Sequence, residues 1–472
     1  MKRLWIVLIC IMLFTAIPAA KADSGASELT DRCTFDFGTQ KEAENNLLNG
    51  KIGASFKAGA SFSMTWDETL EDARLCLQWQ KEPEEVRLLQ YGADETLLRE
   101  ETLPPYPETV SPLLPDARRA VVESGTKEMR LLAVAVYGAG ELPDPFHDWQ
   151  EIPEHVDYLL ISTHPDDDVL YLGSVVPTYG AERGYVGTIV YVTNQNRTRK
   201  SEAENGAWAM GLRVRPVFFG MRDVFSGTTK ARRNLFPYDE LLQNTVRAYR
   251  QLRPLVVFAQ DLNGEYGHWQ HKRTAKAARE AFSLAADPEY DPESAALYGT
   301  WQVQKLYLHL YRKDKILIDA HTPLAAFDGK DAYEVACDAF LKHKSQQRYH
   351  FRVRRDDGQY AFNRFGMAEG VVPVGEDVFD NIDETLFCGY VAPPTPAPSP
   401  MQSEAPEAIQ TPAPSEKPKP SPHPEPAKPA EPDPTPLYWI ASITLLASGA
   451  TGAAAYFWKK RRNETHPPED PA

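Results

Sequence analysis

Two polar segments follow stretches of sequence that have the apolar character of buried strands. Residues 164–168 read His-Pro-Asp-Asp-Asp after the apolar run 156–162, and residues 266–271 read Tyr-Gly-His-Trp-Gln-His after the apolar run 255–259. Three consecutive acids repel one another unless a cation lies beside them. Imidazole and carboxylate together suit zinc, and two histidines with one carboxylate leave a fourth position for water. The chemistry that these residue types allow is attack by a water activated near neutral pH.

Each segment taken alone has a plain structural explanation. An aspartate directly after a strand often caps the next helix, and a His-x-x-His pair is often only part of a polar surface. Their joint position favours a site, because ligands of parallel sheets bind beyond the carboxyl ends of the strands. An aspartate of these segments that does not bind the metal is then a candidate for the general base. A histidine that does not bind the metal is a candidate for the group that stabilises an oxyanion.

The elements that must position these segments alternate between strand and helix. Near-continuous apolar strands are expected at 156–162, 187–193, 217–219 and 255–259, with helices at 200–212 and 238–252. This alternation predicts a Rossmann-like α/β domain at 150–390, with a mostly parallel sheet covered by helices on both faces.

The part of the chain before this domain has a different rhythm. Short alternating segments at 60–66, 87–91 and 129–138 are separated by turn residues, which predicts a small β-sandwich at 23–149. The last of these segments resembles the closing strand of a discoidin-like jelly roll. That resemblance implies sugar binding, and a structural spacer without a ligand remains an equal alternative.

Net charge and proline content bear on the class of protein and on its domain organisation. The chain has 472 residues and a net charge of −15, which argues against a protein built to bind nucleic acid. Of its 39 prolines, 17 lie between Pro393 and Pro436. Such a segment cannot bury a core, so a disordered Pro-rich linker is expected at 391–436.

The two ends predict a cell-membrane, single-pass protein whose N-terminal bulk is extracellular. A basic start, an apolar run and an Ala-Lys-Ala pattern at 20–22 predict a signal peptide at 1–22, although an uncleaved anchor is the alternative. The uncharged segment 437–458 is long enough to cross a bilayer. The Lys-Lys-Arg-Arg that follows it places the tail 459–472 in the cytoplasm. A buried soluble helix is the alternative for 437–458.

Four cysteines remain after removal of the signal peptide, and they permit three pairings in an oxidising compartment. Pairing within each half, Cys33 with Cys76 and Cys337 with Cys388, is the expectation, and free buried thiols are the alternative. The oligomeric state is not predicted.

The two polar segments resemble the signature motifs of the PIG-L/LmbE family, which are zinc-dependent deacetylases of N-acetylglucosaminyl groups. The resemblance covers roughly 156–369. It extends to an arginine–glutamate pair at Arg199 and Glu202, to Asp223, and to a His-Lys-Ser-Gln segment at 343–346. It implies a hydrolase that binds one Zn²⁺ per chain and acts on an N-acetylated sugar or a cell-envelope glycan.

The resemblance also implies roles for individual residues. By position, His164, Asp167 and His271 would hold the zinc ion. Asp166 would act as the general base, and His268 would stabilise the oxyanion or protonate the leaving amine.

Substrate contacts are implied for Arg199, Asp223 and Tyr266, for which a purely structural role is the alternative. Two positions depart from the family pattern. Asp168 stands where glutamate is common, and Trp-Gln at 269–270 replaces the common Pro-Asp. The departures leave the proposed ligands and base in place, but they put the pocket rim and the choice of substrate in doubt.

Two hypotheses from different classes result. The first is a membrane-anchored extracellular zinc deacetylase. The second is a surface carbohydrate-binding or adhesion protein whose deacetylase-like domain is inactive. Retention of every proposed ligand and of the base favours the first, whereas the sandwich and the linker are compatible with both.

Overall fold

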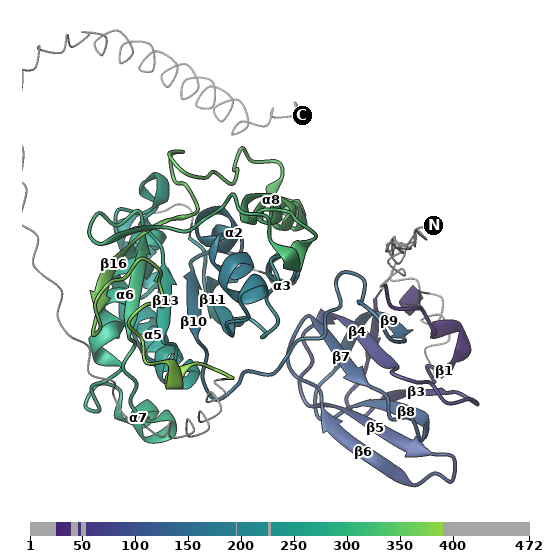
Figure 1. Cartoon of the computed structure of the whole chain (residues 1–472). Helices are drawn as coiled ribbons and strands as arrows, with labels where there is room; N and C mark the ends of the chain where they lie inside the picture. Colours follow the sequence, from purple (N-terminus) through teal and green to yellow (C-terminus); the bar gives the residue numbers. More distant parts are fainter. Residues whose placement is uncertain (1–24, 39–45, 49–52, 195, 225–227, 390–472) are drawn as a thin grey trace, which may run out of the picture. The chain divides into compact units, whose positions relative to one another are not determined.

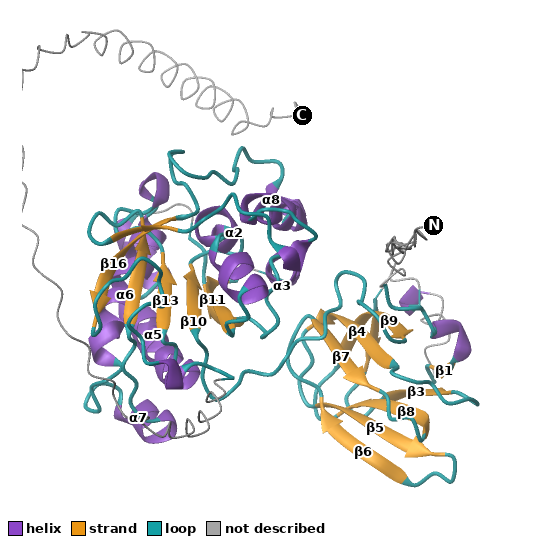
Figure 2. Cartoon of the chain, viewed as in Figure 1, coloured by secondary structure: helices purple, strands orange, loops and turns teal. Residues whose placement is uncertain are grey.

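A computed structural model describes residues 25–38, 46–48, 53–194, 196–224 and 228–389. In this part of the chain, an antiparallel β-sandwich is followed by an α/β domain (Figures 1 and 2). Both folds were predicted from the sequence, and both are confirmed. The boundary between them at residues 149 and 150 remains a prediction.

The predicted signal peptide, Pro-rich linker, membrane helix and cytoplasmic tail lie outside the described residues. Within the described ranges, none of the helices combines the length and the hydropathy needed to span a bilayer.

The sandwich consists of two antiparallel sheets, one in the order β1-β3-β8-β5-β6 and the other in the order β2-β9-β4-β7. Its strands are β1 (Thr34–Asp36), β2 (Ala54–Phe56), β3 (Ser61–Thr65), β4 (Arg74–Lys81), β5 (Val86–Gly92), β6 (Leu97–Thr102), β7 (Glu108–Pro112), β8 (Ala117–Ser124) and β9 (Met129–Tyr137), with a short turn η1 (Thr30–Arg32) before them. Buried side chains from both sheets form one core. Trp79 lies inside it, and its indole Nε1 donates to Thr109 Oγ1 over 3.0 Å.

The α/β domain is built on one seven-stranded sheet in the order β12-β11-β10-β13-β14-β16-β15. Its strands are β10 (Tyr158–Ser162), β11 (Gly187–Thr193), β12 (Val217–Met221), β13 (Val256–Ala259), β14 (Lys305–His309), β15 (Lys315–Leu317) and β16 (Arg364–Gly370). The strands from β12 to β14 are parallel, and β16 runs antiparallel to both its neighbours.

The helices of this domain are α2 (Asp167–Leu172), α3 (Arg197–Ala209), α4 (Thr229–Leu235), α5 (Tyr238–Leu252), α6 (Trp269–Leu284), α7 (Pro292–Tyr298) and α8 (Ala332–Lys342). A seven-residue π-helix, η2 (Val176–Glu182), follows α2. The short 3-10 helices are η3 (Glu265–Gly267), η4 (Ala325–Phe327), η5 (Lys344–Gln346) and η6 (Glu384–Leu386).

Helices cover both faces of the sheet (Figure 1). Successive side chains of a strand point to opposite faces, so both faces carry side chains that the helices bury. Tyr158 and Leu160 pack with α2, α3 and α8, whereas Leu159 and Ile161 pack with α5 and α6. All four side chains are at most 1% exposed. A strand buried on both faces therefore has to be apolar throughout, which explains the continuous apolar run in the sequence.

The four described cysteines are free thiols, so the preferred pairing within each half is wrong. Cys33 lies at the edge of the sandwich core, whereas Cys76 is fully buried in a separate apolar cluster. Cys337 belongs to α8 and packs against the core of the α/β domain, and Cys388 donates to the backbone carbonyl oxygen of His155. Each sulfur is therefore in its own environment, away from its expected partner.

The contact between β10 and β11 requires a glycine at position 187. Gly187 is the register partner of Tyr158, and a Cβ at this position would lie 2.1–2.4 Å from three atoms of the Tyr158 ring. We expect Gly187→Ala to lower the free energy of unfolding by about 1–3 kcal/mol, because the buried ring has no room to move. Urea unfolding of the two proteins measures this effect, and an unchanged midpoint would contradict it.

Candidate metal and catalytic site

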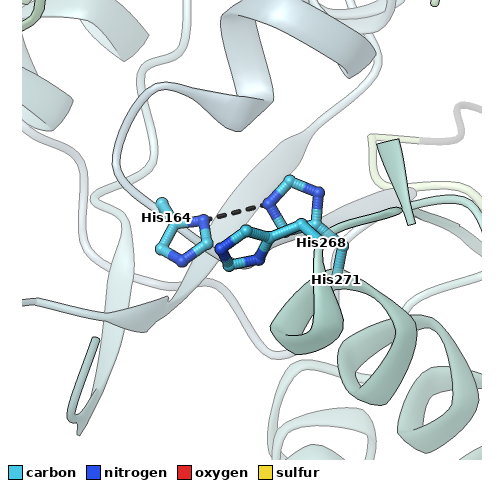
Figure 3. Close-up of side chains that lie close together, drawn as sticks. All are labelled: His164, His268 and His271. Carbon is cyan, nitrogen blue, oxygen red and sulfur yellow. Dashed lines mark hydrogen bonds between the residues drawn. The ribbon is translucent and has the colours of Figure 1, made fainter. Parts of the chain in front are cut away.

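The two polar segments lie at the carboxyl ends of adjacent parallel strands, as predicted. The first follows β10 and enters α2, and the second follows β13 and enters α6. Figure 3 shows His164 from the first segment beside His268 and His271 from the second. The ring nitrogens of His164 and His271 are 3.1 Å apart, although the residues are 107 positions apart in sequence.

The predicted ligand set of His164, Asp167 and His271 forms a compact triangle of donor atoms. Asp167 Oδ2 lies 2.9 Å from His164 Nδ1 and 3.2 Å from His271 Nε2. A tetrahedral zinc ion with bonds of ~2.0–2.2 Å separates its ligand atoms by about 3.3–3.6 Å. The triangle needs only a small expansion to reach this size, and two imidazoles with one carboxylate are typical zinc ligands. These three residues therefore fit a zinc ion.

A second set of possible ligands shares two of these residues. His164, His268 and His271 each offer a ring nitrogen, and these nitrogens lie within 4.8 Å of one another. Nδ1 of His268 is buried and makes no hydrogen bond to any described residue. The two sets differ only in whether Asp167 or His268 completes the site, and the ligand role of Asp167 stays a prediction.

Asp166 occupies the N-cap position of α2, but its side chain makes no capping hydrogen bond. The interpretation of Asp166 as a helix cap is therefore wrong. Its backbone has a φ of 151°, a conformation that non-glycine residues rarely adopt and that clusters at functional sites. Burial raises the pKa of Asp166 to about 7, while the nearby Arg199 guanidinium opposes this shift. A carboxylate with a pKa near the working pH is suited to general-base catalysis.

Arg199 belongs to a network that holds Asp166. Its Nη2 donates to Asp166 Oδ1 over 3.0 Å and to the Pro165 carbonyl oxygen, and its Nη1 donates to Glu202 Oε2 over 3.2 Å. Glu202 in turn accepts from the backbone nitrogen and the hydroxyl of Ser345, over 2.6 and 2.7 Å. The predicted contact of Arg199 with substrate remains a prediction, and the structure adds a positioning role for it.

The two departures from the family pattern have structural partners. Asp168 is fully buried and accepts from the Tyr191 hydroxyl over 2.7 Å, so it faces the core and not a pocket rim. Gln270 accepts from the backbone nitrogen of Val224 and donates to the carbonyl oxygen of Arg222, each over 3.1 Å. Gln270 thereby holds the loop that carries Asp223.

Two of the predicted substrate-binding residues lie beside the ligand set. Asp223 Oδ1 is 3.6 Å from His164 Nε2, and its side chain is 27% exposed. The ring of Tyr266 is centred 5.6 Å from His268 and 5.5 Å from His271. Both side chains can be reached from solvent next to the metal ligands. Their contact with substrate stays a prediction.

His268 differs electrostatically from the two histidines of the ligand set. Burial, together with the nearby His271 and His164, lowers the pKa of His268 to about 3. A neutral ring at physiological pH can donate one hydrogen bond but is a poor proton acceptor. This state favours stabilisation of an oxyanion over protonation of the amine.

Two buried residues that the sequence analysis missed support His271 from behind. Glu265 Oε2 accepts from His271 Nδ1 over 2.7 Å, and Glu265 Oε1 lies 2.6 Å from His309 Nδ1. Burial alone would raise the pKa of Glu265, but hydrogen bonds from the two histidines outweigh it and lower the pKa to about 2. The resulting carboxylate orients His271 so that Nε2 faces the other ligands, as carboxylates behind metal-binding histidines do. The only sequence signal for this contact is that Glu265 stands six residues before the proposed ligand His271.

The comparison with protein families agrees with this geometry. The family model PIG-L, described as GlcNAc-PI de-N-acetylase, matches residues 159–282. This range contains the proposed metal ligands, the proposed base and Glu265. Residues 159–282 therefore form a PIG-L family domain, which confirms the resemblance noted in the sequence.

Known proteins are similar to parts of the chain. A 1D-myo-inositol 2-acetamido-2-deoxy-alpha-D-glucopyranoside deacetylase 1 from Catenulispora acidiphila is 29% identical over 179 residues, which cover 32% of this chain and 54% of the relative. The chain spans 54–59% of the length of three such curated relatives.

Two solved structures align with the chain at low scores. The N,N'-diacetylchitobiose deacetylase from Pyrococcus horikoshii aligns with 40% of this chain and 71% of that chain, at 20% identity and a TM-score of 0.33. A fucose binding module from Streptococcus pneumoniae aligns with 24% of this chain and 97% of that chain, at 10% identity and a TM-score of 0.19. Scores of this size assign no activity to this chain.

The two overlapping ligand sets can be separated by substitution. We expect Asp167→Ala to lose the metal, because a three-ligand site cannot spare one ligand, whereas His268→Ala should retain it. Zinc per chain, measured by atomic emission after dialysis, checks this expectation. Full zinc stoichiometry in Asp167→Ala together with loss in His268→Ala would assign the ligand role to His268 instead.

The role of Glu265 can be tested by metal affinity. Glu265→Gln keeps the shape of the side chain but removes the charge that orients His271, so the zinc dissociation constant should rise about 10- to 100-fold. Competition with a chromophoric chelator measures this constant. Glu204→Gln is the matched control, since Glu204 is a buried acid that pairs with Arg215 away from the ligands. An equal effect of both substitutions would show a general loss of stability only.

Proposed function

We propose that this chain is a metal-dependent deacetylase that hydrolyses the N-acetyl amide of an N-acetylglucosamine-type sugar or envelope glycan. The observation that carries the proposal is the position of one strained, buried carboxylate, Asp166, directly beside a compact triangle of metal-ligand atoms. The triangle and the carboxylate lie inside the PIG-L family domain. The deacetylase activity named for the similar relatives points to the same reaction.

The residues of the site have separate tasks in this reaction. His164, Asp167 and His271 would hold a zinc ion, which when bound would supply Lewis-acid polarisation of the acetyl carbonyl. Asp166 takes a proton from the attacking water as the new C–O bond forms. Arg199 fixes the carboxylate in place through the 3.0 Å contact with Asp166.

Collapse of the tetrahedral intermediate breaks the C–N bond and needs a proton on the leaving nitrogen. Asp166, protonated in the first step, can return that proton to the amine, so the products are acetate and a free amino sugar. The neutral ring of His268 donates a hydrogen bond to the developing oxyanion. A preorganised donor of this kind contributes about 2.7–4 kcal/mol in other amide hydrolases.

We also propose that the enzyme acts at the outer face of the cell membrane. The support is in the sequence: the signal-peptide pattern at 1–22, the uncharged segment 437–458 and the four basic residues that follow it. The Pro-rich segment 391–436 would separate the catalytic domain from the bilayer.

A surface carbohydrate-binding protein with an inactive domain is the alternative. Zinc content and acetate release from N-acetylglucosamine oligomers, measured on the same full-length protein, separate the two. Bound zinc together with catalytic acetate release supports the deacetylase. Zinc without acetate release from any N-acetylated sugar tested would overturn it.

Asp166→Asn tests the proposed base directly. The substitution keeps the size of the side chain but removes the oxygen that accepts the proton, so turnover should fall about 10²- to 10⁴-fold. Metal content should equal that of the parent, because Asp166 is not part of the predicted ligand set. Zinc per chain and acetate release are measured side by side. Normal metal with a near-normal rate would exclude the base role.

A further inference from the structure

A row of aromatic rings leads from the metal ligands toward solvent. The ring of Tyr266 is centred 5.5 Å from His271 and 6.0 Å from Phe351. The ring of Phe351 is in turn centred 6.1 Å from Tyr349. Tyr266 and Tyr349 are 48% and 46% exposed, so both rings are accessible to a ligand from solvent. We call Tyr266, Phe351 and Tyr349 the aromatic row.

The outer end of the aromatic row lines a groove of about 410 Å³. Tyr333 and Phe340 supply further apolar wall, and His350 and Arg352 supply polar atoms. Ligand sites combine an apolar lining with a few polar groups that fix orientation. A sugar ring has matching chemistry, because its C–H face is apolar and its hydroxyl groups accept and donate hydrogen bonds. An acyl chain would have no use for the polar groups.

The segment that carries the outer rings is fastened to the catalytic network. Ser345, four residues before Tyr349, donates its backbone nitrogen and its hydroxyl to Glu202. Glu202 accepts from Arg199, which also contacts Asp166. The groove and the proposed base are therefore held by one chain of hydrogen bonds, so a ligand in the groove has a defined position relative to Asp166.

We propose that the aromatic row is an extended glycan-binding subsite, and that the substrate is an N-acetylated oligosaccharide or polysaccharide that occupies the metal site and the groove together. The distance along the row, from Tyr266 to Tyr349, is at most about 12 Å by the two centroid steps. Phe351 and Tyr349 follow Tyr266 in the row, so the row offers ring faces to further sugar residues beyond the one that lies at the metal ligands. The proposal rests on the proposed deacetylase function and adds the length of the substrate to it.

A larger groove elsewhere on the domain is the internal comparison. It measures about 760 Å³ and is lined by Tyr311, Leu317 and Arg364 among others. None of its lining residues belongs to the ligand set or to the aromatic row. The ring contact of its lining residue Phe351 with Tyr266, and not its size, therefore selects the smaller groove.

The test compares N-acetylglucosamine and its oligomers of two to six residues as substrates of the zinc-loaded full-length protein. The Michaelis constant should fall with chain length in the parent. Tyr349→Ala should raise the Michaelis constant for the hexamer about 2- to 10-fold, the range expected for one ring contact, and leave the monosaccharide unaffected. Tyr349→Phe keeps the ring and should behave as the parent. Leu317→Ala, at an apolar side chain that is 60% exposed in the larger groove, is the control.

Binding separates failure of this inference from failure of the proposed function. The affinity of the hexamer for Asp166→Asn, with and without Tyr349→Ala, is measured by calorimetry. Acetate release without any effect of chain length or of Tyr349→Ala would overturn the subsite alone. Hexamer binding that depends on Tyr349 without acetate release would overturn the deacetylase but support the subsite. No release and no binding that depends on Tyr349 would overturn both.

Gel filtration of the parent and of Tyr349→Ala completes the test. A dimer of the parent that Tyr349→Ala dissociates would show that a second copy of this chain covers the aromatic row, which contradicts glycan binding. An equal elution volume for both proteins agrees with the subsite.

Discussion

The pairing of β10 with β13 is the contact on which the site depends. These strands lie side by side in parallel register from Tyr158 with Val256 to Ile161 with Ala259, so their carboxyl ends are level. The residues just beyond the ends are tied together as well, since the Thr163 backbone nitrogen donates to Gln260 Oε1 over 3.0 Å. Two segments that are about a hundred residues apart in sequence are therefore held at the distance of metal ligands.

This arrangement concentrates acids in a buried place, which is unfavourable unless each acid has a partner. Asp167 lies between two histidines, Glu265 lies between His271 and His309, and Asp166 has Arg199. Each carboxylate thus has a donor on the protein side. Asp167 and Glu265 both contact His271, so two negative charges have one imidazole ring between them. A cation between His271 Nε2 and Asp167 would balance this charge, so charge and geometry both favour a bound metal.

Backbone strain is found on both sides of the site. Asp166, with a φ of 151°, directly precedes Asp167, and Tyr266, with a φ of 45°, has its ring centred 5.5 Å from His271. Strain of this kind costs about 1–3 kcal/mol per residue and persists where the surrounding structure enforces it. For Asp166 the enforcing contacts come from Arg199, which binds both its carboxylate and the preceding carbonyl oxygen. The conformation directs the carboxylate away from the helix N-terminus that it would otherwise cap.

The sequence by itself determined the class of each fold, some of the strands, and the segments that carry the chemistry. Continuous apolar runs identified β10, β11 and β13, because a strand buried on both faces needs apolar residues at every position. Only the tertiary structure decided which carboxylates and histidines act together. Glu265 and His309 are 44 residues apart and have no periodic pattern, so their contact behind His271 depends on the pairing of β13 with β14. The free cysteines and the aromatic row likewise depend on the tertiary structure. A sequence pattern indicates which residues are buried, but it does not indicate which residues lie in contact.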